Sequence, residues 1–475
     1  MKKRSLAVII VLVLVVLVAL AASTVTLAAF NQNKKAIIIV TALMSGGLYD
    51  GVTGEPVWDP LPYDLGVYDF MNVEALPAAL ETIFSDSEKF NKMLEIIGYA
   101  MSGEQNADNL IWKLSLDQYG VPNYPDLKVS NDYKGRLYYG ALNAYKEQFE
   151  DLKARYGREY EVRMFNYDWR IDNRDNSRLL EEFINSNNYS KVIFTSHSMG
   201  AQVVSGYLAR SAENRDKVLA YCAYAGAFMG AVDALTYLED INKVLEFVDV
   251  GELLNSFGLG AFLPMDMLID FLNTQMKPMI QNMPGIIGLL PNWEFLNSDQ
   301  YITDHGITIG GVPIASEDDL YEFYSTREWS YLRNDDGTIM TEADGVTPKL
   351  KPFVASLRDF HDSLYVTLDD GSRVQASTLV NTHYFAGQNM TTCIGIDYAA
   401  DASVSSMTLR RSLYGDAIVP LYSALAGRSI ADLGDRYHTF DATFESGDVG
   451  NHVNVGCMWR ILKDATCAII DSISG

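Results

Sequence analysis

A serine at the apex of a predicted strand–turn–helix is the residue of this chain best placed to do chemistry. The apolar run Lys191–Thr195 ends abruptly in the pentapeptide Ser196–Gly200, and a helix-like segment, residues 201–209, follows at once. A sharp turn at a helix N-terminus presents a serine Oγ to a base and to backbone N–H groups, which a weak nucleophile requires. The turn therefore predicts Ser198 as a nucleophile, although this serine could instead only cap the helix.

The pentapeptide differs at one position from the Gly-x-Ser-x-Gly sequence of a nucleophile elbow. Its first position holds Ser196 in place of glycine. Strand and helix pass close together at such a turn, so this position requires a small side chain. Serine is small enough, and the departure leaves the prediction in place.

An elbow serine needs a histidine to accept its proton and a carboxylate to orient that histidine, in the chain order Ser, Asp, His. Among six histidines, His452 lies in a loop rich in Gly, Asp and Asn, and Asp416 lies in a Gly-Asp turn beside an apolar run. His438 is the alternative base, although its neighbours predict a strand. His197, within the pentapeptide, is expected to point away from the serine's side of the turn. The spacing thus predicts a triad of Ser198, Asp416 and His452.

Four motifs, taken together and in this order, resemble those of the lecithin:cholesterol acyltransferase family, the α/β-hydrolases that move fatty acyl groups between lipids. They are a Tyr-Asp-Trp-Arg signature, the serine motif, a Gly-Asp-x-x-Val-Pro acid loop and a late histidine, at Phe165–Arg170, Ser196–Gly200, Gly415–Pro420 and Asn451-His452. Weaker similarity runs through Tyr224–Ala231 and Met283–Asn292. The resemblance implies Ser198 as nucleophile, Asp416 as acid and His452 as base.

The same resemblance implies an oxyanion hole built from backbone N–H groups. One donor would be Met199, directly after the nucleophile. The other would come from the loop after the predicted strand Ala36–Val40, where this chain has Thr41-Ala42 and the family has Pro-Gly. That departure leaves the second donor open between Leu43 and Met44. Each donor should contribute a few kcal/mol of transition-state stabilisation.

The fold class follows from apolar strands that recur at the spacing of β–α units. They are Ala36–Val40, Glu161–Phe165, Lys191–Thr195, Val218–Tyr224 and Thr382–Ala386. Such alternation favours an α/β fold with a mostly parallel central sheet and helices on both faces. With the motifs above, we expect an α/β-hydrolase fold, divided into a signal segment (1–30), a first core part (31–231), a helical cap (232–351) and a second core part (352–475). An Asp-Gly β-hairpin is expected at Tyr365–Val374.

The predicted cap is rich in Met, Phe and Leu at helical spacing. Flexible side chains of this kind adapt to irregular apolar ligands such as acyl chains. We expect most of them to form the core of the cap and a minority to face the site. They are Leu259, Phe262, Leu263, Met265, Met267, Leu268, Phe271, Leu272, Met276 and Met279.

Two tryptophans are candidates for binding substrate. Trp58 lies in the segment Tyr49–Tyr68, which could be a mobile lid beside the oxyanion loop or an ordinary surface loop. Trp169 lies within the Tyr-Asp-Trp-Arg signature. Its neighbours Asp168 and Arg170 are expected to form a buried pair that braces the loops around the site.

The N-terminal sequence predicts on which side of the membrane the protein is located. Basic residues at positions 2–4 precede an apolar run, Leu6–Ala22, which is typical of a secretory signal or a signal anchor. Its length is enough to span a bilayer, so we expect a retained anchor or a secreted protein, with the catalytic domain outside the cytoplasm in either case.

Composition limits the partners. A net charge of −24 argues against nucleic acid and against electrostatic attraction to an anionic membrane. No cofactor or metal site is expected, and four cysteines allow at most one bridge among Cys393, Cys457 and Cys467 if Cys222 lies in a core strand. The family resemblance implies a lipid or other acyl-ester substrate as the partner, and the N-terminal segment is the expected contact to the membrane.

The function indicated is serine-dependent lipid acyl transfer through an acyl-enzyme. Resolution by an alcohol gives an O-acyltransferase, and resolution by water gives a phospholipase or lipase. The alternatives are a hydrolase of soluble esters or amides and a non-catalytic surface binding protein.

Overall fold

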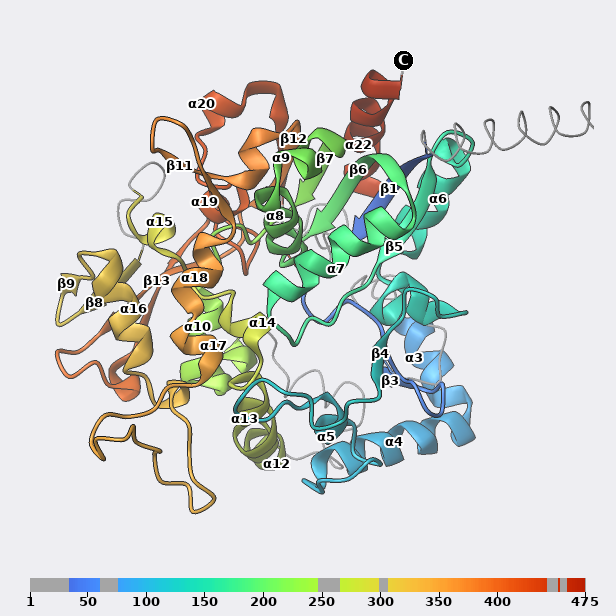
Figure 1. Ribbon diagram of the computed structural model, residues 1–475. Coiled ribbons are helices and arrows are strands. Elements are labelled where there is room, and N and C mark those ends of the chain that lie inside the picture. Colours follow the sequence, from blue (N-terminus) through green and yellow to red (C-terminus); the bar gives the residue numbers. More distant parts are fainter. Residues whose placement is uncertain are drawn as a thin grey trace, which may run out of the picture.

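The computed structural model describes residues 34–59, 76–246, 265–298, 306–441, 452 and 459–474. Within them, six parallel strands form a central sheet with the order β15-β12-β7-β6-β1-β5 (Figure 1). The strands are β1 (Lys34–Val40), β5 (Glu161–Phe165), β6 (Tyr189–His197), β7 (Val218–Tyr224), β12 (Thr382–Gln388) and β15 (Tyr437–Asp441). The predicted α/β-hydrolase fold class is confirmed, and the five predicted strands lie within this sheet.

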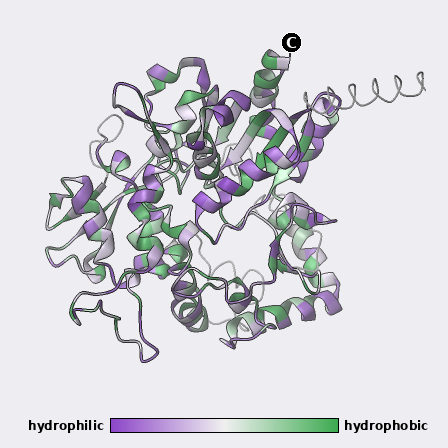
Figure 2. Cartoon of the chain, in the orientation of Figure 1, coloured by the Kyte–Doolittle hydropathy of each residue, from purple (hydrophilic) through white to green (hydrophobic). Residues whose placement is uncertain are grey.

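Helices cover both faces of the sheet because its strands are apolar on both sides. Alternate residues of β1 show this: Ile37 and Ile39 join one core cluster, and Ile38 and Val40 join another. The first cluster packs against α6 (Lys146–Tyr156) and α22 (Trp459–Ser474), and the second against α7 (Asn173–Ser186) and α8 (Gly200–Arg210). Hydrophobic colour follows the strands, and the surrounding helices are mixed (Figure 2).

The strand order reverses between β6 and β1, and ligands of open parallel sheets bind beyond the carboxyl ends of the strands at such a point. The chain leaves β1, β6 and β12 at this edge, and β15 ends there, because all six strands are parallel. Residues far apart in sequence are thereby brought to one place.

In the described residues between β1 and α6, a small three-stranded sheet of order β3-β2-β4 and three α-helices lie beyond the central sheet (Figure 1). These elements are β2 (Leu48–Asp50), β3 (Pro56–Trp58), α3 (Leu76–Ser85), α4 (Ser87–Met101), α5 (Leu110–Leu114), β4 (Leu127–Val129), and the 3₁₀ turns η1 (Arg136–Tyr139) and η2 (Ala141–Asn143). Trp58 ends β3, so this predicted substrate-binding residue lies in an ordered strand. The rest of its predicted lid segment, residues 60–68, lies outside the described residues.

The predicted cap begins with helices and continues with strands. Its elements are α10 (Val232–Glu239), η3 (Ile241–Glu246), α12 (Met265–Phe271), the π-helical turn η4 (Leu272–Met276), α13 (Lys277–Ile280), α14 (Pro284–Ile287), α15 (Trp293–Leu296), β8 (Gly306–Ile309), β9 (Val312–Pro313), α16 (Glu317–Ser325) and η5 (Glu328–Ser330). Strand β8 pairs with β13 (Thr392–Tyr398) in a second sheet of order β14-β13-β8-β9. The insertion is therefore not wholly helical, and it shares a sheet with the second core part. The exact domain boundaries remain a prediction.

A buried ion pair ties the two ends of the insertion together. Arg327, after α16, donates two hydrogen bonds of 2.6 and 2.8 Å to the carboxylate of Glu239, at the end of α10. The Trp329 indole also donates to Glu239, and Arg327 donates to the carbonyl of Ala402 in the second core part. Losing one partner would leave a buried charge uncompensated.

The remaining elements complete the second core part. They are α17 (Pro352–Ala355), α18 (Leu357–Asp362), β10 (Tyr365–Thr367), β11 (Arg373–Gln375), η6 (Ala376–Leu379), η7 (Val404–Ser406), β14 (Thr408–Ser412), α19 (Leu421–Ala424), α20 (Ile430–Leu433) and η8 (Gly434–Arg436). Strands β10 and β11 pair antiparallel, as the Asp-Gly sequence predicts.

The predicted signal or anchor segment, residues 1–30, lies outside the described residues. Within the described ones, no helix is long and apolar enough to cross a membrane. Cys222, Cys393 and Cys467 are free and buried, so no bridge joins Cys393 to Cys467. Cys457 lies outside the described residues.

Candidate active site

The predicted elbow forms at the carboxyl end of β6. Ser198 has a left-handed backbone (φ 53°), and its N–H donates to the carbonyl of Tyr224 at the end of β7 (3.0 Å). A Cβ at Gly200 would lie 2.6 Å from the backbone oxygen of Thr41, so glycine is needed where β1 meets the helix. Ser196, which replaces the usual first glycine, fits because its hydroxyl bonds Tyr221 Oη at 2.6 Å.

The structure brings Ser198, His452 and Asp416 together in one hydrogen-bonded series. His452 Nε2 lies 2.7 Å from Ser198 Oγ, and His452 Nδ1 lies 2.9 Å from Asp416 Oδ2. Asp416 is held by the N–H of Val419, 2.9 Å from its other oxygen. All three side chains are buried. A serine, an imidazole and a carboxylate in this geometry can pass a proton from the serine to the imidazole.

His438, the alternative base, lies elsewhere. It is on β15, its Nε2 lies 3.2 Å from Nδ1 of His383, and its ring stacks on Phe385 with centroids 4.4 Å apart. It does not contact the elbow serine, so the structure favours His452 as the partner of Ser198.

His197 does not point away from the site, and that prediction is wrong. Its ring lies beside the ring of His452, with centroids 5.0 Å apart, in the same cavity wall as Ser198. Its Nε2 lies 3.0 Å from the carbonyl oxygen of His452, and its Nδ1 lies 3.3 Å from Tyr145 Oη. These contacts to His452 and Tyr145 fix the direction of the ring.

In a neutral His197 ring, only one arrangement of protons satisfies these contacts. A carbonyl only accepts, so His197 Nε2 carries the proton, and Nδ1 of the neutral ring accepts from the Tyr145 hydroxyl. Tyr145 Oη in turn accepts from the N–H of Ala42, at 3.0 Å. Burial, together with the neighbouring His452, lowers the pKa of His197 well below its usual value, which keeps this ring neutral. One hydrogen-bond chain therefore joins the base to the loop after β1.

The backbone of His452 is held at both ends. Its carbonyl accepts from His197, and its N–H donates to the carbonyl of Asp416 at 2.8 Å. The imidazole is thus positioned by main-chain contacts as well as by the Asp416 carboxylate.

The predicted oxyanion donors lie around the serine. The N–H of Ala42 is occupied by Tyr145, which leaves Leu43 and Met44 as candidates in this loop. Both line the cavity with Ser198, and Met44 has a left-handed backbone (φ 57°). Met199 follows the nucleophile and is the N-cap residue of α8. These three donors remain predictions.

Both candidate tryptophans line the cavity and also hold the oxyanion loop. Trp58 Nε1 donates to the carbonyl of Met44 at 2.5 Å, and Trp169 Nε1 donates to that of Gly46 at 3.3 Å. Their rings meet edge to face with centroids 5.4 Å apart. They could therefore contact substrate and fix the loop at the same time.

Arg170 and Asp168 form the predicted bracing pair. Two hydrogen bonds of 2.7 and 2.8 Å join the guanidinium to the carboxylate, and Arg170 is buried. The same guanidinium donates to the carbonyls of Lys113 and Leu114. It thereby fixes α5 against the loop that follows β5.

An apolar cavity of about 700 Å³ opens onto Ser198 and His452. Its walls come from α5, α10, the η4–α13 segment and the loop after Asp416. Of the Met-rich set, the described residues Leu272, Met276 and Met279 face it, whereas Met265 and Met267 are exposed. Leu259, Phe262 and Leu263 lie outside the described residues. A cavity of this size and polarity suits a hydrocarbon chain.

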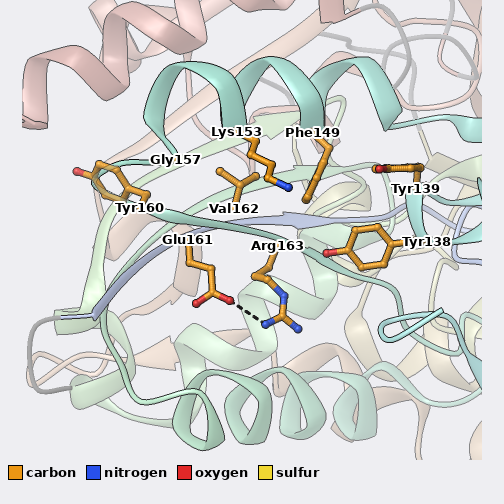
Figure 3. A pocket seen from close by; sticks show the side chains of 9 residues that line it. All are labelled: Tyr138, Tyr139, Phe149, Lys153, Gly157, Tyr160, Glu161, Val162 and Arg163. Carbon is orange, nitrogen blue, oxygen red and sulfur yellow. Dashed lines mark hydrogen bonds and ion pairs between the residues drawn. The ribbon is translucent and has the colours of Figure 1, made fainter. Parts of the chain in front are cut away.

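A smaller cavity of about 400 Å³ lies at the β5 edge of the sheet (Figure 3). Its lining is aromatic, and its acid, Glu161, is paired with Lys34 and Arg163. No serine, cysteine, threonine or histidine lines it. The elbow cavity is therefore the candidate active site.

One acid in the wall of the elbow cavity was not predicted. Asp233, in the first turn of α10, is 1% exposed, and neither of its oxygens has a hydrogen-bond partner within the described part of the chain. Burial raises its pKa to about 8; the charge of Arg411 opposes this shift, and the Asp416 carboxylate adds to it. From sequence it reads as an ordinary first-turn acid of a helix.

Comparison with known proteins confirms the family resemblance over part of the chain. The family model for lecithin:cholesterol acyltransferase matches residues 132–242, which include the Tyr-Asp-Trp-Arg signature, the elbow and Asp233. No curated protein sequence matches the chain. Among solved structures, a chain of the crystal structure of the Tle4–Tli4 complex is similar, with 12% identity, 93% of this chain and 99% of that chain covered, and a TM-score of 0.39.

Proposed function

We propose that this protein is a serine-dependent acyl-transfer enzyme that acts on lipid esters outside the cytoplasm. The observation that carries the proposal is the series Ser198–His452–Asp416, with contacts of 2.7 and 2.9 Å, in the wall of an apolar cavity. The family match supports lipid acyl transfer or hydrolysis as the general activity.

In this mechanism, Ser198 Oγ attacks the ester carbonyl while His452 Nε2 accepts its proton. Asp416 stabilises the imidazolium, and His452 then returns the proton to the leaving alcohol. The N–H groups of Met199 and of Leu43 or Met44 stabilise the tetrahedral oxyanion. The acyl chain remains on Ser198 until water or an acceptor alcohol attacks the acyl-enzyme and regenerates the serine.

The approach to lipid would rely on apolar contact and tethering, because a chain of net charge −24 is not attracted to an anionic surface. The apolar N-terminal run is proposed as the signal or anchor. Exposed Met267 and Ile269 on α12, beside the cavity-lining η4 turn, offer a second apolar contact.

The test supplies the purified domain, residues 31–475, with phosphatidylcholine vesicles that contain a long-chain alcohol. The proposal expects free fatty acid, acylated alcohol or both, and neither product with Ser198→Ala or His452→Ala. The ratio of the two products separates hydrolase from transferase. Turnover of short soluble esters with no activity on vesicles would instead support a soluble-ester hydrolase.

A further inference from the structure

The carboxyl of Asp233 is a buried polar group without a partner in the wall of the apolar cavity. It lies among Ala231, Ala234 and Tyr237, which line the same wall. Neither oxygen is hydrogen-bonded within the described residues. Buried polar side chains are nearly always paired, and an exception requires an explanation.

The other buried acids around the cavity are paired. Asp59, also in the cavity wall, bonds Arg136 and the N–H of Leu142. Glu239, at the other end of α10, is paired with Arg327. The chain therefore supplies partners for carboxylates in this region and leaves Asp233 facing the ligand space.

A neutral carboxyl offers one O–H donor and further acceptor capacity. Burial raises the pKa of this carboxyl to about 8, so the neutral form predominates at neutral pH. A hydroxyl group, which also donates and accepts, complements it without bringing a charge into the apolar cavity. A purely hydrocarbon ligand would leave the carboxyl unpaired.

We propose that Asp233 binds a hydroxyl group of the substrate, so that the cavity selects long-chain esters that carry a free hydroxyl. The inference rests on the proposed function and specifies its substrate class. A site built to hydrogen-bond a substrate hydroxyl discriminates strongly against the analogue that lacks it, because its own polar group is then left unpaired.

The hydroxyl can reside on either side of the ester, and matched substrates distinguish the two. One arm compares 1-monolauroylglycerol with propyl laurate, which lacks the free hydroxyls. The other compares p-nitrophenyl esters of hydroxydodecanoic acids with p-nitrophenyl dodecanoate. We expect the wild type to favour the hydroxylated member by about tenfold or more in kcat/KM in at least one arm.

Three variants connect that preference to Asp233. Asp233→Leu and Asp233→Ala remove the polar group, and both should bring the ratio within about twofold of one. Asp233→Asn keeps a donor and an acceptor at the same size, so it should retain part of the preference. Labelling of Ser198 by a fluorophosphonate reports whether each variant keeps an intact site.

The outcomes separate this inference from the proposed function. A wild type that is neither labelled nor active on any ester refutes the proposed function itself. A labelled, active wild type with no preference in either arm refutes only the role of Asp233. A preference that survives in Asp233→Leu or Asp233→Ala also refutes it. Loss of Ser198 labelling in both Asp233→Leu and Asp233→Ala would also refute this role, because Asp233 would then be required for the folded structure of the site.

Discussion

The unpaired carboxyl of Asp233 should lower the stability of the protein as pH rises. Its pKa is about 8 in the folded chain against an ordinary value of 3.8. Between these values, the unfolded chain releases the proton and the folded chain keeps it, so the free energy of unfolding falls with increasing pH. Below the lower value both states are protonated, and above the higher value the penalty is constant.

The magnitude follows from about 1.4 kcal/mol per pKa unit. Between about pH 5 and pH 7.5, Asp233 alone should remove about 3 kcal/mol of stability. Asp233→Asn abolishes this dependence, because an amide does not titrate in this range. The stability of the variant relative to wild type should therefore increase by about 3 kcal/mol over that interval.

Urea unfolding of both proteins at several pH values measures this difference, provided the denaturant slope is unchanged. Any constant effect of the amide cancels, since only the change with pH is used. Asp266→Asn, on the exposed side of α12, is the matched control. A stability difference between Asp233→Asn and wild type that stays constant from pH 5 to 7.5 would show that Asp233 does not keep its proton in the folded chain over this range.

Three further variants test other contacts. His197→Phe should lower kcat by about 10- to 100-fold with little change in KM, because the His452 carbonyl loses its donor. His361→Phe replaces a buried histidine of α18, in the second core part, and should lower Tm without this loss of kcat. Equal losses of kcat in the two variants would contradict the expectation. Met267→Asp should reduce activity on vesicles several-fold and leave soluble-ester turnover unchanged. An unaltered rate on vesicles would show that α12 does not contact the lipid. Gly200→Ala should destabilise by about 1–3 kcal/mol in urea unfolding, because its Cβ meets a backbone oxygen at 2.6 Å; wild-type stability would show that the elbow relaxes.

Local sequence patterns predicted the central sheet well, since its strands are short apolar runs bounded by turns. The second sheet escaped prediction because β8 and β13 are separated by more than eighty residues and pair through backbone contacts that leave no local pattern. The insertion was therefore expected to be helical throughout.

The site residues also divide into those with a sequence signal and those whose placement depends on tertiary contacts. Ser198, Asp416 and His452 were selected by motif and chain order, which depend on chemistry. The direction of His197 depends on how the elbow turn packs against His452, some 250 residues later in the chain, and sequence spacing does not encode that contact. The sequence gives no signal for Asp233, because its lack of a hydrogen-bond partner is a property of the tertiary structure.

Ser198 should act as a nucleophile that His452 activates. The most direct measurement is reaction with a fluorophosphonate probe, with the adduct located by peptide mass spectrometry. We expect one phosphonylated residue, Ser198, in the wild type, loss of the adduct in Ser198→Ala, and labelling slowed by orders of magnitude in His452→Ala. A folded wild-type protein that forms no adduct would show that Ser198 is not a nucleophile, and an equal rate of labelling in His452→Ala would show that His452 does not activate it.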